Sequence, residues 1–415
     1  MSLLARRKAI LVFLAFALAY FLSALIRAIT GTLSPVLTAE FKLSASELGL
    51  LAGGYFLGFA ATQLPLGTWL DAYGPKRVIV GFLAIAVLGC IAFSLASGFA
   101  GLLMARILCG VGVSACLMAP LTGYRRWLDG PSLLRANSWM LMTGSLGMVA
   151  STLPVQWLVP VTGWRPLFLG LAAMLLAAMA VIAWQVPVWP ATGLPADGGK
   201  PAPASYSEVW RHPAFRRMAP IGFFIYGGLL AMQTLWVVPW MTQVAGYSPL
   251  EAATGIFWIN IGMLFSFWGW GLFSPSLARR GYTAARLITL GMPLSFLTLA
   301  IIIIADNSIS TGATAIFILY FISCTFISLA QPAVGMAFPA NLAGRALSAY
   351  NLVIFSGIFV IQWGIGLLID AFKRMGFTEI QSFKAAFGVF LLCCLGSYWH
   401  FLMAKSHNQG IERYE

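Results

Sequence analysis

Long apolar stretches alternate with short polar connections along almost the whole chain of 415 residues. An α-helix needs about 20 apolar residues to cross the hydrocarbon core of a bilayer, and it satisfies its own backbone hydrogen bonds. Each stretch of this length therefore predicts a transmembrane helix. The twelve expected spans are residues 9–33, 46–68, 76–97, 99–121, 136–158, 163–186, 217–243, 252–274, 284–305, 311–335, 345–370 and 381–403.

A single long polar interruption divides these spans into six and six. It runs from Pro187 to Arg217, and its density of Pro and Gly rules out a continuous helix. From residue 206 onwards it mixes Trp and Phe with basic residues, which is typical of a helix lying along the membrane interface. We expect an N-terminal six-helix bundle at 1–186, a cytoplasmic linker with an interfacial helix at 187–216, a C-terminal six-helix bundle at 217–403 and a cytoplasmic tail at 404–415.

The composition places this chain in the bilayer. Hydrophobic residues make up 60% of the chain, charged residues make up 9%, and the mean hydropathy is +0.87. So little polar surface cannot cover a soluble domain of this length. The expected fold class is an all-α integral membrane protein with 12 transmembrane helices.

The net charge of +13 is distributed unevenly over the predicted connections. If the N-terminus is cytoplasmic, most basic residues fall in cytoplasmic segments, and the opposite side holds only Lys42, Arg165, Lys373, Arg374 and Lys384. This positive-inside pattern predicts that both termini are cytoplasmic, in a multi-pass protein of the bacterial inner membrane. It also accounts for the charge without a nucleic-acid partner, so the lipid bilayer is the expected surrounding.

Two short motifs stand out in the N-terminal half. Residues 67–77, after the second span, read Gly-Thr-Trp-Leu-Asp-Ala-Tyr-Gly-Pro-Lys-Arg, and residues 106–112 in the fourth span read Arg-Ile-Leu-Cys-Gly-Val-Gly. The first resembles the signature G-x-L-x-D-x-x-G-x-(K/R)-(K/R) between helices 2 and 3 of the major facilitator superfamily, and the second resembles its helix 4 pattern R-x-x-x-G-x-G. The resemblance to bacterial transporters of this family extends over nearly the whole chain.

This resemblance implies two pseudo-symmetric halves, a substrate site between them and transport by alternating access. It also implies that Asp71 helps to hold the halves together when the cavity opens outward, by facing the N-terminal end of the eleventh helix. The helix 5 motif of drug/proton antiporters is missing from residues 144–154, which disfavours proton-driven drug export. The residues expected to act in gating are Gly67, Asp71, Gly74, Lys76, Arg77 and Arg345.

Charged residues inside the spans are candidates for a functional site, because burying a charge in the bilayer is costly. Arg27 and Arg106 each lie roughly 10 Å from the outer end of a span, at about 1.5 Å per residue. No Asp or Glu lies in the middle of any span. The resemblance puts both arginines on helices that line the central cavity, and a guanidinium group can bind a carboxylate or phosphate with two hydrogen bonds. We therefore expect a small organic anion, in the first place a carboxylate, as the substrate.

Other roles for the two arginines stay open. Arg27 can extend to the outer interface or pair with Glu40 or Glu47, which are expected on that side. Arg106 can serve structure or coupling, as the resemblance implies for the helix 4 arginine.

Polar and aromatic residues supply the rest of the expected site. Tyr20, Ser23 and Arg27 are spaced three and four residues apart, so they share one face of the first helix. Tyr and Trp offer stacking surfaces and hydrogen bonds, although such residues also pack and bridge helices. The predicted substrate-binding residues are Arg27, Tyr20, Ser23, Arg106, Tyr226, Gln233, Trp236, Tyr320 and Asn351. Further polar or aromatic positions in the spans are Thr30, Tyr55, Gln63, Trp240, Ser323, Gln331 and Gln362.

The sequence leaves the coupling of transport to an ion open. The three histidines, His212, His400 and His407, lie in the linker or near the C-terminus. Glu47 and Asp370, at outer helix ends, are the remaining carboxylate candidates, and either can be a solvated helix cap. Facilitated diffusion, exchange of anions and symport with a proton or another ion are all compatible with this pattern.

The sequence predicts no enzyme, no cofactor and no bound metal. The six cysteines fall inside predicted spans without metal-ligand spacing, and the chain has no recognisable nucleophile–base pair or Gly-rich phosphate loop. A monomeric transporter is the expected form. Two alternatives remain: efflux of aromatic or amphipathic compounds and, in another class, a non-transporting membrane sensor or assembly factor.

Overall fold

The computed structural model describes residues 4–188, 206–304 and 312–404. The described residues leave out most of the predicted linker. They also leave out the predicted tail except residue 404, so His407 lies outside them. Within the described ranges every regular element is a helix, as the expected all-α class requires.

The spans expected in the N-terminal half are built by α1 to α8. Three of these spans are divided between helices, because α2 is followed directly by α3, α4 by α5 and α6 by α7. The bounds are α1 (Arg6–Phe41), α2 (Ala45–Ala61), α3 (Gln63–Leu95), α4 (Phe99–Val113), α5 (Ala115–Trp127), α6 (Gly130–Ala150), α7 (Leu153–Thr162) and α8 (Trp164–Gln185).

The C-terminal half begins with the short helix α9 (Tyr206–Arg211), which lies in the segment expected at the membrane interface. The seventh expected span is not a uniform α-helix, because two π-helical turns interrupt it, and the tenth contains a 3₁₀ turn. The bounds are α10 (Pro213–Ile221), π turn η1 (Gly222–Tyr226), α11 (Gly227–Ala231), π turn η2 (Met232–Trp236), α12 (Val237–Gln243), α13 (Pro249–Arg279), α14 (Ala284–Ile304), α15 (Ala313–Cys324), 3₁₀ turn η4 (Thr325–Leu329), α16 (Ala330–Met336), α17 (Ala340–Arg374) and α18 (Glu379–Met403).

Ten helical runs of the described chain are long and apolar enough to cross a membrane. The second expected span is shared by α2 and the start of α3, and the fifth is shared by α6 and α7. Gly74 separates the second span from the third with φ 76°, a conformation that glycine adopts without strain, and Pro75 follows it. The motif after the second span is therefore a sharp bend inside α3.

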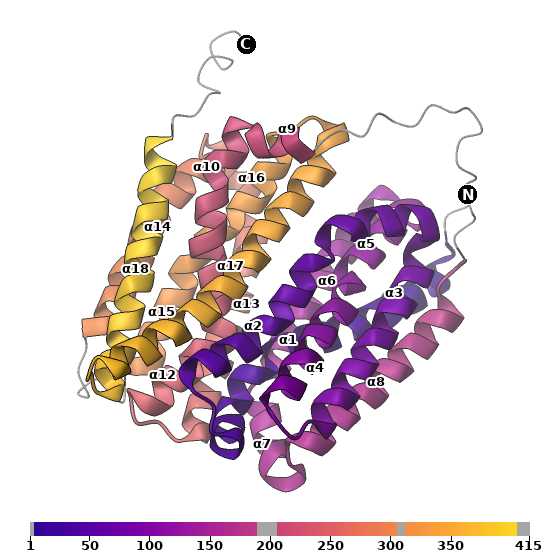
Figure 1. Ribbon diagram of the computed structural model, residues 1–415. Helices are drawn as coiled ribbons and strands as arrows, with labels where there is room; N and C mark the ends of the chain where they lie inside the picture. The colour runs from indigo at the N-terminus through magenta and orange to yellow at the C-terminus, as the bar shows by residue number, and fades with distance from the viewer. Residues whose placement is uncertain (1–3, 189–205, 305–311, 405–415) are drawn as a thin grey trace.

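The two ends of the molecule are distinguished by where its helices begin and stop. α1 begins beside the end of α5, since the Leu4 N–H donates to the Trp127 carbonyl at 3.1 Å. In Figure 1, α9 and the end of α18 lie at this same end, at the top of the view. We call it the termini end, and we call the opposite end, where α2 and α18 begin, the far end.

Figure 1 shows two bundles side by side, one made by α1–α8 and the other by α10–α18. They touch where α2 meets α17 and where α1 meets η2. Glycines allow this approach, because a Cβ atom on Gly31 would lie 2.8 Å from the Thr234 carbonyl oxygen, and one on Gly49 would collide with the Gln362 carbonyl. These contacts lie in the part of the bundles nearer the far end, so the halves are closed there.

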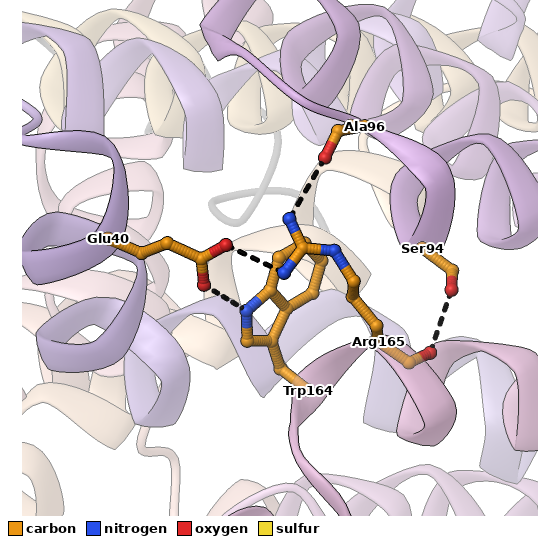
Figure 2. A network of polar contacts seen from close by, with 5 residues as sticks. All are labelled: Glu40, Ser94, Ala96, Trp164 and Arg165. Carbon is orange, nitrogen blue, oxygen red and sulfur yellow. Dashed lines mark hydrogen bonds and ion pairs between the residues drawn. The ribbon is translucent and has the colours of Figure 1, made fainter.

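A polar network ties three helices of the N-terminal half together at the far end (Figure 2). Glu40 of α1 accepts hydrogen bonds from Trp164 Nε1 at 2.7 Å and from Arg165 Nη1 at 2.6 Å. Arg165 also donates to the Ala96 carbonyl at 3.3 Å, and its own carbonyl accepts from Ser94 at 2.9 Å. The end of α1 is thereby fixed to the start of α8 and the end of α3.

Candidate substrate site

Arg27 lies deep inside α1, on the helix face that also carries Tyr20 and Ser23. Its side chain is half-buried, and its Nε is buried without a hydrogen-bond partner in the described part of the chain. The guanidinium carbon lies 5.9 Å from the ring centroid of Phe59 on α2. Its charge interacts with the hydroxyl groups of Tyr20 and Tyr55.

Hydroxyl groups from both halves lie close enough to Arg27 to interact with its charge. Tyr226, the last residue of η1, lies within electrostatic reach of Tyr20 and Arg27 across the interface between the halves. Ser23 has a buried Oγ without a hydrogen-bond partner, and its carbonyl accepts a weak hydrogen bond from the Tyr55 hydroxyl at 3.4 Å. We call Tyr20, Ser23, Arg27, Tyr55 and Tyr226 the Arg27 cluster. The cluster combines one fixed positive charge with four hydroxyl donors and contains no carboxylate.

Arg106 on α4 lies outside this cluster, although sequence analysis expected it beside Arg27. It is fully buried, and its Nη1 donates to the Ile26 carbonyl at 2.9 Å. Its guanidinium carbon lies over the Tyr55 ring, 5.0 Å from the centroid. Its Nε and Nη2 are buried without hydrogen-bond partners among the described residues. Arg106 therefore supports Tyr55 and the backbone next to Arg27 and does not face an open site.

The carboxylates that sequence analysis offered as partners of Arg27 have other partners. Glu40 binds Arg165 and Trp164 (Figure 2). Glu47 Oε2 accepts hydrogen bonds from the Ser44 N–H at 2.9 Å and the Ser44 hydroxyl at 3.0 Å, as part of the N-terminal cap of α2. An ion pair of Arg27 with either carboxylate is thus not present in this conformation.

Gln233 and Trp236, two of the expected binding residues on η2, connect helices. Gln233 donates to Asn260 Oδ1 at 2.6 Å, and Asn260 donates a weak hydrogen bond to the Met148 carbonyl of α6 in the other half, at 3.4 Å. Trp236 is fully buried and donates to the Gln362 carbonyl of α17 at 3.1 Å. Both side chains thus have the helix-bridging role that sequence analysis left open.

Tyr320 and Asn351 also lie within the C-terminal half. Tyr320 on α15 is buried, and its ring meets Phe321 edge-on with centroids 5.1 Å apart. Asn351 on α17 accepts a hydrogen bond from Gln331 Nε2 of α16 at 2.7 Å. Of the expected binding residues, the structure therefore brings Tyr20, Ser23, Arg27 and Tyr226 together.

The residues expected to act in gating lie at the termini end. Asp71 is exposed, and Arg345 is half-buried near the start of α17. Neither forms an ion pair, because the ion pairs of the described residues join Arg165 to Glu40 and Lys373 to Glu379. Gly67, Gly74, Lys76 and Arg77 belong to the same bend of α3 as Asp71.

Tyr55 and Phe59 are the residues of the site whose importance the sequence did not reveal. Tyr55 was one polar position among many, yet its ring lies under Arg106 and its hydroxyl interacts electrostatically with Arg27. Phe59 packs against Phe355 of α17, with ring centroids 4.3 Å apart and ring planes tilted by 36°, and so joins the two halves beside Arg27. The small residues Gly54 and Gly58 were the available signal, since they bring this face of α2 against α4.

Comparison with known proteins gives relatives over most of the chain. The sequence profile of the family described as Major Facilitator Superfamily matches residues 16–362. A probable sulfoacetate transporter of Cupriavidus necator is 25% identical over 356 residues, which is 79% of each chain. A probable 4-methylmuconolactone transporter of Cupriavidus pinatubonensis is 25% identical over 383 residues, 87% of this chain and 85% of that one. A 4-hydroxybenzoate transporter of Pseudomonas putida is 30% identical over 163 residues, 38% of this chain and 36% of that one.

Solved structures share the fold. A bacterial homolog of the human lysosomal transporter Spinster, in an inward-facing and unoccupied conformation, superposes with a TM-score of 0.78 at 17% identity, covering 96% of this chain and 97% of that one. A D-xylose-proton symporter superposes with a TM-score of 0.75 at 13% identity, covering 96% of this chain and 100% of that one. At these identities the likeness shows the fold alone.

Proposed function

Because the chain belongs to the major facilitator superfamily, and is a multi-pass membrane transporter and not an enzyme, we propose that it carries a small organic anion across the membrane by alternating access. The preferred substrate has a carboxylate group. Arg27 binds this group with both arms of its guanidinium, and the hydroxyls of the Arg27 cluster donate to the remaining oxygen lone pairs.

The observation that carries the proposal is a charge without a counter-charge. Arg27 has a buried, unpartnered Nε, and the ion-paired carboxylates of the described residues are bound to Arg165 and Lys373. A cation taken out of water without a partner is poorly compensated. An anionic substrate supplies the missing charge, and the four hydroxyls around it cannot do so.

The names of two relatives support the same class. One is a probable sulfoacetate transporter and another is a 4-hydroxybenzoate transporter, and both names denote small organic acids. The identities are low, so these names favour the chemical class and select no single compound. An aromatic acid would in addition find the Phe59–Phe355 pair beside Arg27.

In this proposal Arg106 acts on the substrate through Tyr55. Its guanidinium lies over the Tyr55 ring and donates to the carbonyl of Ile26, the residue before Arg27. Arg106 therefore fixes the Tyr55 ring and the backbone next to Arg27, and these two groups orient the cluster. This role differs from the direct contact that the equal depth of the two arginines suggested.

We place the termini end in the cytoplasm. Arg125 and Arg126 end α5 there, and Arg279 ends α13 there, in agreement with the positive-inside rule. Since the halves touch near the far end, this orientation makes the conformation inward-facing. Asp71 would then regain its partner near Arg345 when the termini end closes.

A ligand panel tests the proposal on the purified full chain. Binding to 4-hydroxybenzoate and sulfoacetate is measured by thermal shift and by isothermal titration calorimetry, with 4-hydroxybenzamide as the matched neutral control. We expect the anions to raise the unfolding temperature and the amide to leave it unchanged, because a ligand stabilises the state that it binds. Stabilisation by hydrophobic cations but by none of the anions would instead favour efflux of amphipathic compounds.

A further inference from the structure

Asp370, near the end of α17 in the C-terminal half, binds the beginning of α2 in the N-terminal half. Its Oδ1 accepts a hydrogen bond from the Ala45 N–H at 3.2 Å, and its Oδ2 accepts one from the Ser46 N–H at 2.8 Å. Sequence analysis treated this carboxylate as a coupling candidate or as a solvated cap. It is a cap, and the helix that it caps belongs to the other half.

The first amides of α2 show why this contact matters. A helix leaves its first N–H groups without partners inside the helix. The Ser44 N–H donates to Glu47 at 2.9 Å and the Glu47 N–H donates to the Ser44 hydroxyl at 3.2 Å, which leaves the amides of Ala45 and Ser46 for Asp370. Two of these four amides therefore donate to the other half of the protein, and they must exchange this carboxylate for water when the far end opens.

Two other helices that begin at the far end are capped by their own residues. Ser248 and Glu251 form a reciprocal capping box at the start of α13, and Thr378 and Gln381 form one at the start of α18. α2 has such a box too, and Asp370 is added to it from the opposite half.

A close backbone seam places Asp370 at this position. A Cβ atom on Gly366, one turn before Asp370, would collide with the Ala45 carbonyl, and one on Gly49 would collide with the Gln362 carbonyl. The carboxylate thus lies at the end of a seam in which α2 and α17 touch through glycines. Opening of the far end separates this seam and withdraws the carboxylate from both amides at once.

We propose that Asp370 is a gating residue of the transport cycle, which holds the far end closed by binding the positively polarised N-terminus of α2. Its action opposes the one expected of Asp71 at the termini end. Asp71 favours the conformation that is open at the far end, and Asp370 favours the conformation described here. The inference needs only the transporter fold and is independent of the substrate.

Hydrogen–deuterium exchange of the purified full chain, read by mass spectrometry, tests this role. In Asp370→Ala we expect faster exchange in peptides covering 44–56 and 358–370, with the population of the open far end raised roughly 2- to 25-fold. Peptides covering 66–77 and 342–352 should exchange more slowly, because the termini end closes when the far end opens. Asp370→Asn keeps the shape and one acceptor, and it should give a smaller change in the same directions.

Glu379→Gln is the matched control. Glu379 is another carboxylate at the far end, but it pairs with Lys373 inside the C-terminal half, with Nζ to Oε2 2.6 Å. Its loss should leave exchange in α2 unchanged. Unchanged exchange at the far end of folded Asp370→Ala would overturn the proposal, and so would faster exchange at both ends, which indicates general loosening. If the alanine variant does not fold, Asp370→Asn is measured instead. Unchanged exchange at the far end, or faster exchange at both ends, in that variant would then overturn the proposal.

Discussion

Arg27 and Arg106 are the same residue type at about the same depth, and both lie near an aromatic ring, but they differ in exposure and in the groups around them. Arg27 is half-buried, lies near hydroxyls from both halves, and interacts with the Phe59 ring. Arg106 is fully buried inside one half, where it donates to a backbone carbonyl and lies over the Tyr55 ring. Depth in the membrane therefore identifies costly charges, but the packing around each charge decides whether a ligand can reach it.

The comparison predicts that Arg27 controls affinity. Arg27→Gln should weaken binding of the carboxylate ligand by about ten- to a hundredfold, because a charge-assisted hydrogen bond is worth roughly 1.5–3 kcal/mol. Arg27→Lys keeps the charge but loses the planar guanidinium that can bind a carboxylate with two hydrogen bonds, so it should recover only part of the affinity. Calorimetric titration measures both, with Arg286→Gln, an exposed arginine at the termini end, as the control. Wild-type affinity in Arg27→Gln would show that Arg27 does not bind the anion.

Arg106 should instead affect stability, and its removal should leave the free energy of unfolding unchanged or raise it. Its cation is buried with two unpartnered nitrogens, so the cost of removing it from water is not repaid by an ion pair. Replacing even a buried ion pair by apolar side chains of similar volume is often neutral or stabilising by about 1–4 kcal/mol. Arg106→Met should therefore unfold at the same or a higher denaturant concentration than the wild type, while affinity falls less than in Arg27→Gln. An equal loss of affinity in Arg106→Met and Arg27→Gln would mean that Arg106 also contacts the substrate, and the proposed difference between the two arginines would be wrong.

Tyr55 separates the two roles within one side chain. Tyr55→Phe removes the hydroxyl near Arg27 and keeps the ring under Arg106. Loss of one hydrogen bond of about 0.5–1.5 kcal/mol should weaken ligand binding about two- to tenfold, with the unfolding temperature unchanged. Tyr55→Leu removes both functions, so it should lower affinity further and change stability as well. If the two variants behave alike, the ring alone matters.

Substitution of Asp71, at the termini end, should leave the surroundings of both arginines unchanged. Its effect on transport should be the smallest of the effects predicted here. Asp71→Asn weakens an anion-to-helix contact of about 0.3–1 kcal/mol in the conformation closed at that end. Initial uptake into proteoliposomes should slow about two- to fivefold, with ligand affinity unchanged. Asp129→Asn, an exposed aspartate that precedes α6, serves as the control. An equal effect of the two substitutions would mean that the motif around Asp71 acts only as a bend.

The pattern of apolar stretches was sufficient to predict the all-α membrane fold, because length and hydropathy alone decide whether a helix can cross a bilayer. It could not predict how individual spans are interrupted. The π turns η1 and η2 fall in a stretch whose sequence reads as an ordinary apolar helix. Such turns depend on packing against neighbouring helices, which a single sequence does not contain.

The site was predictable only in part. Spacing on α1 placed Tyr20, Ser23 and Arg27 on one face, because helical periodicity is a local property. The enclosure of Arg106 depends on contacts between α2 and α4, where Gly110 meets the Tyr55 backbone. The partner of Asp370 lies more than 300 positions away in the chain. No local pattern specifies which helix a distant carboxylate will cap.

The π turn η1 ends at Tyr226, and this has a mechanical consequence for the cluster. A π turn holds one more residue per turn than an α-helix would, so its conversion to α-helix rotates the residues on one side by roughly 100° about the helix axis. The Tyr226 hydroxyl would then leave Arg27 without any movement of one bundle against the other. In the proposed site, a local change of helical winding would thus rearrange the surface around Arg27, in addition to the expected rocking of whole bundles.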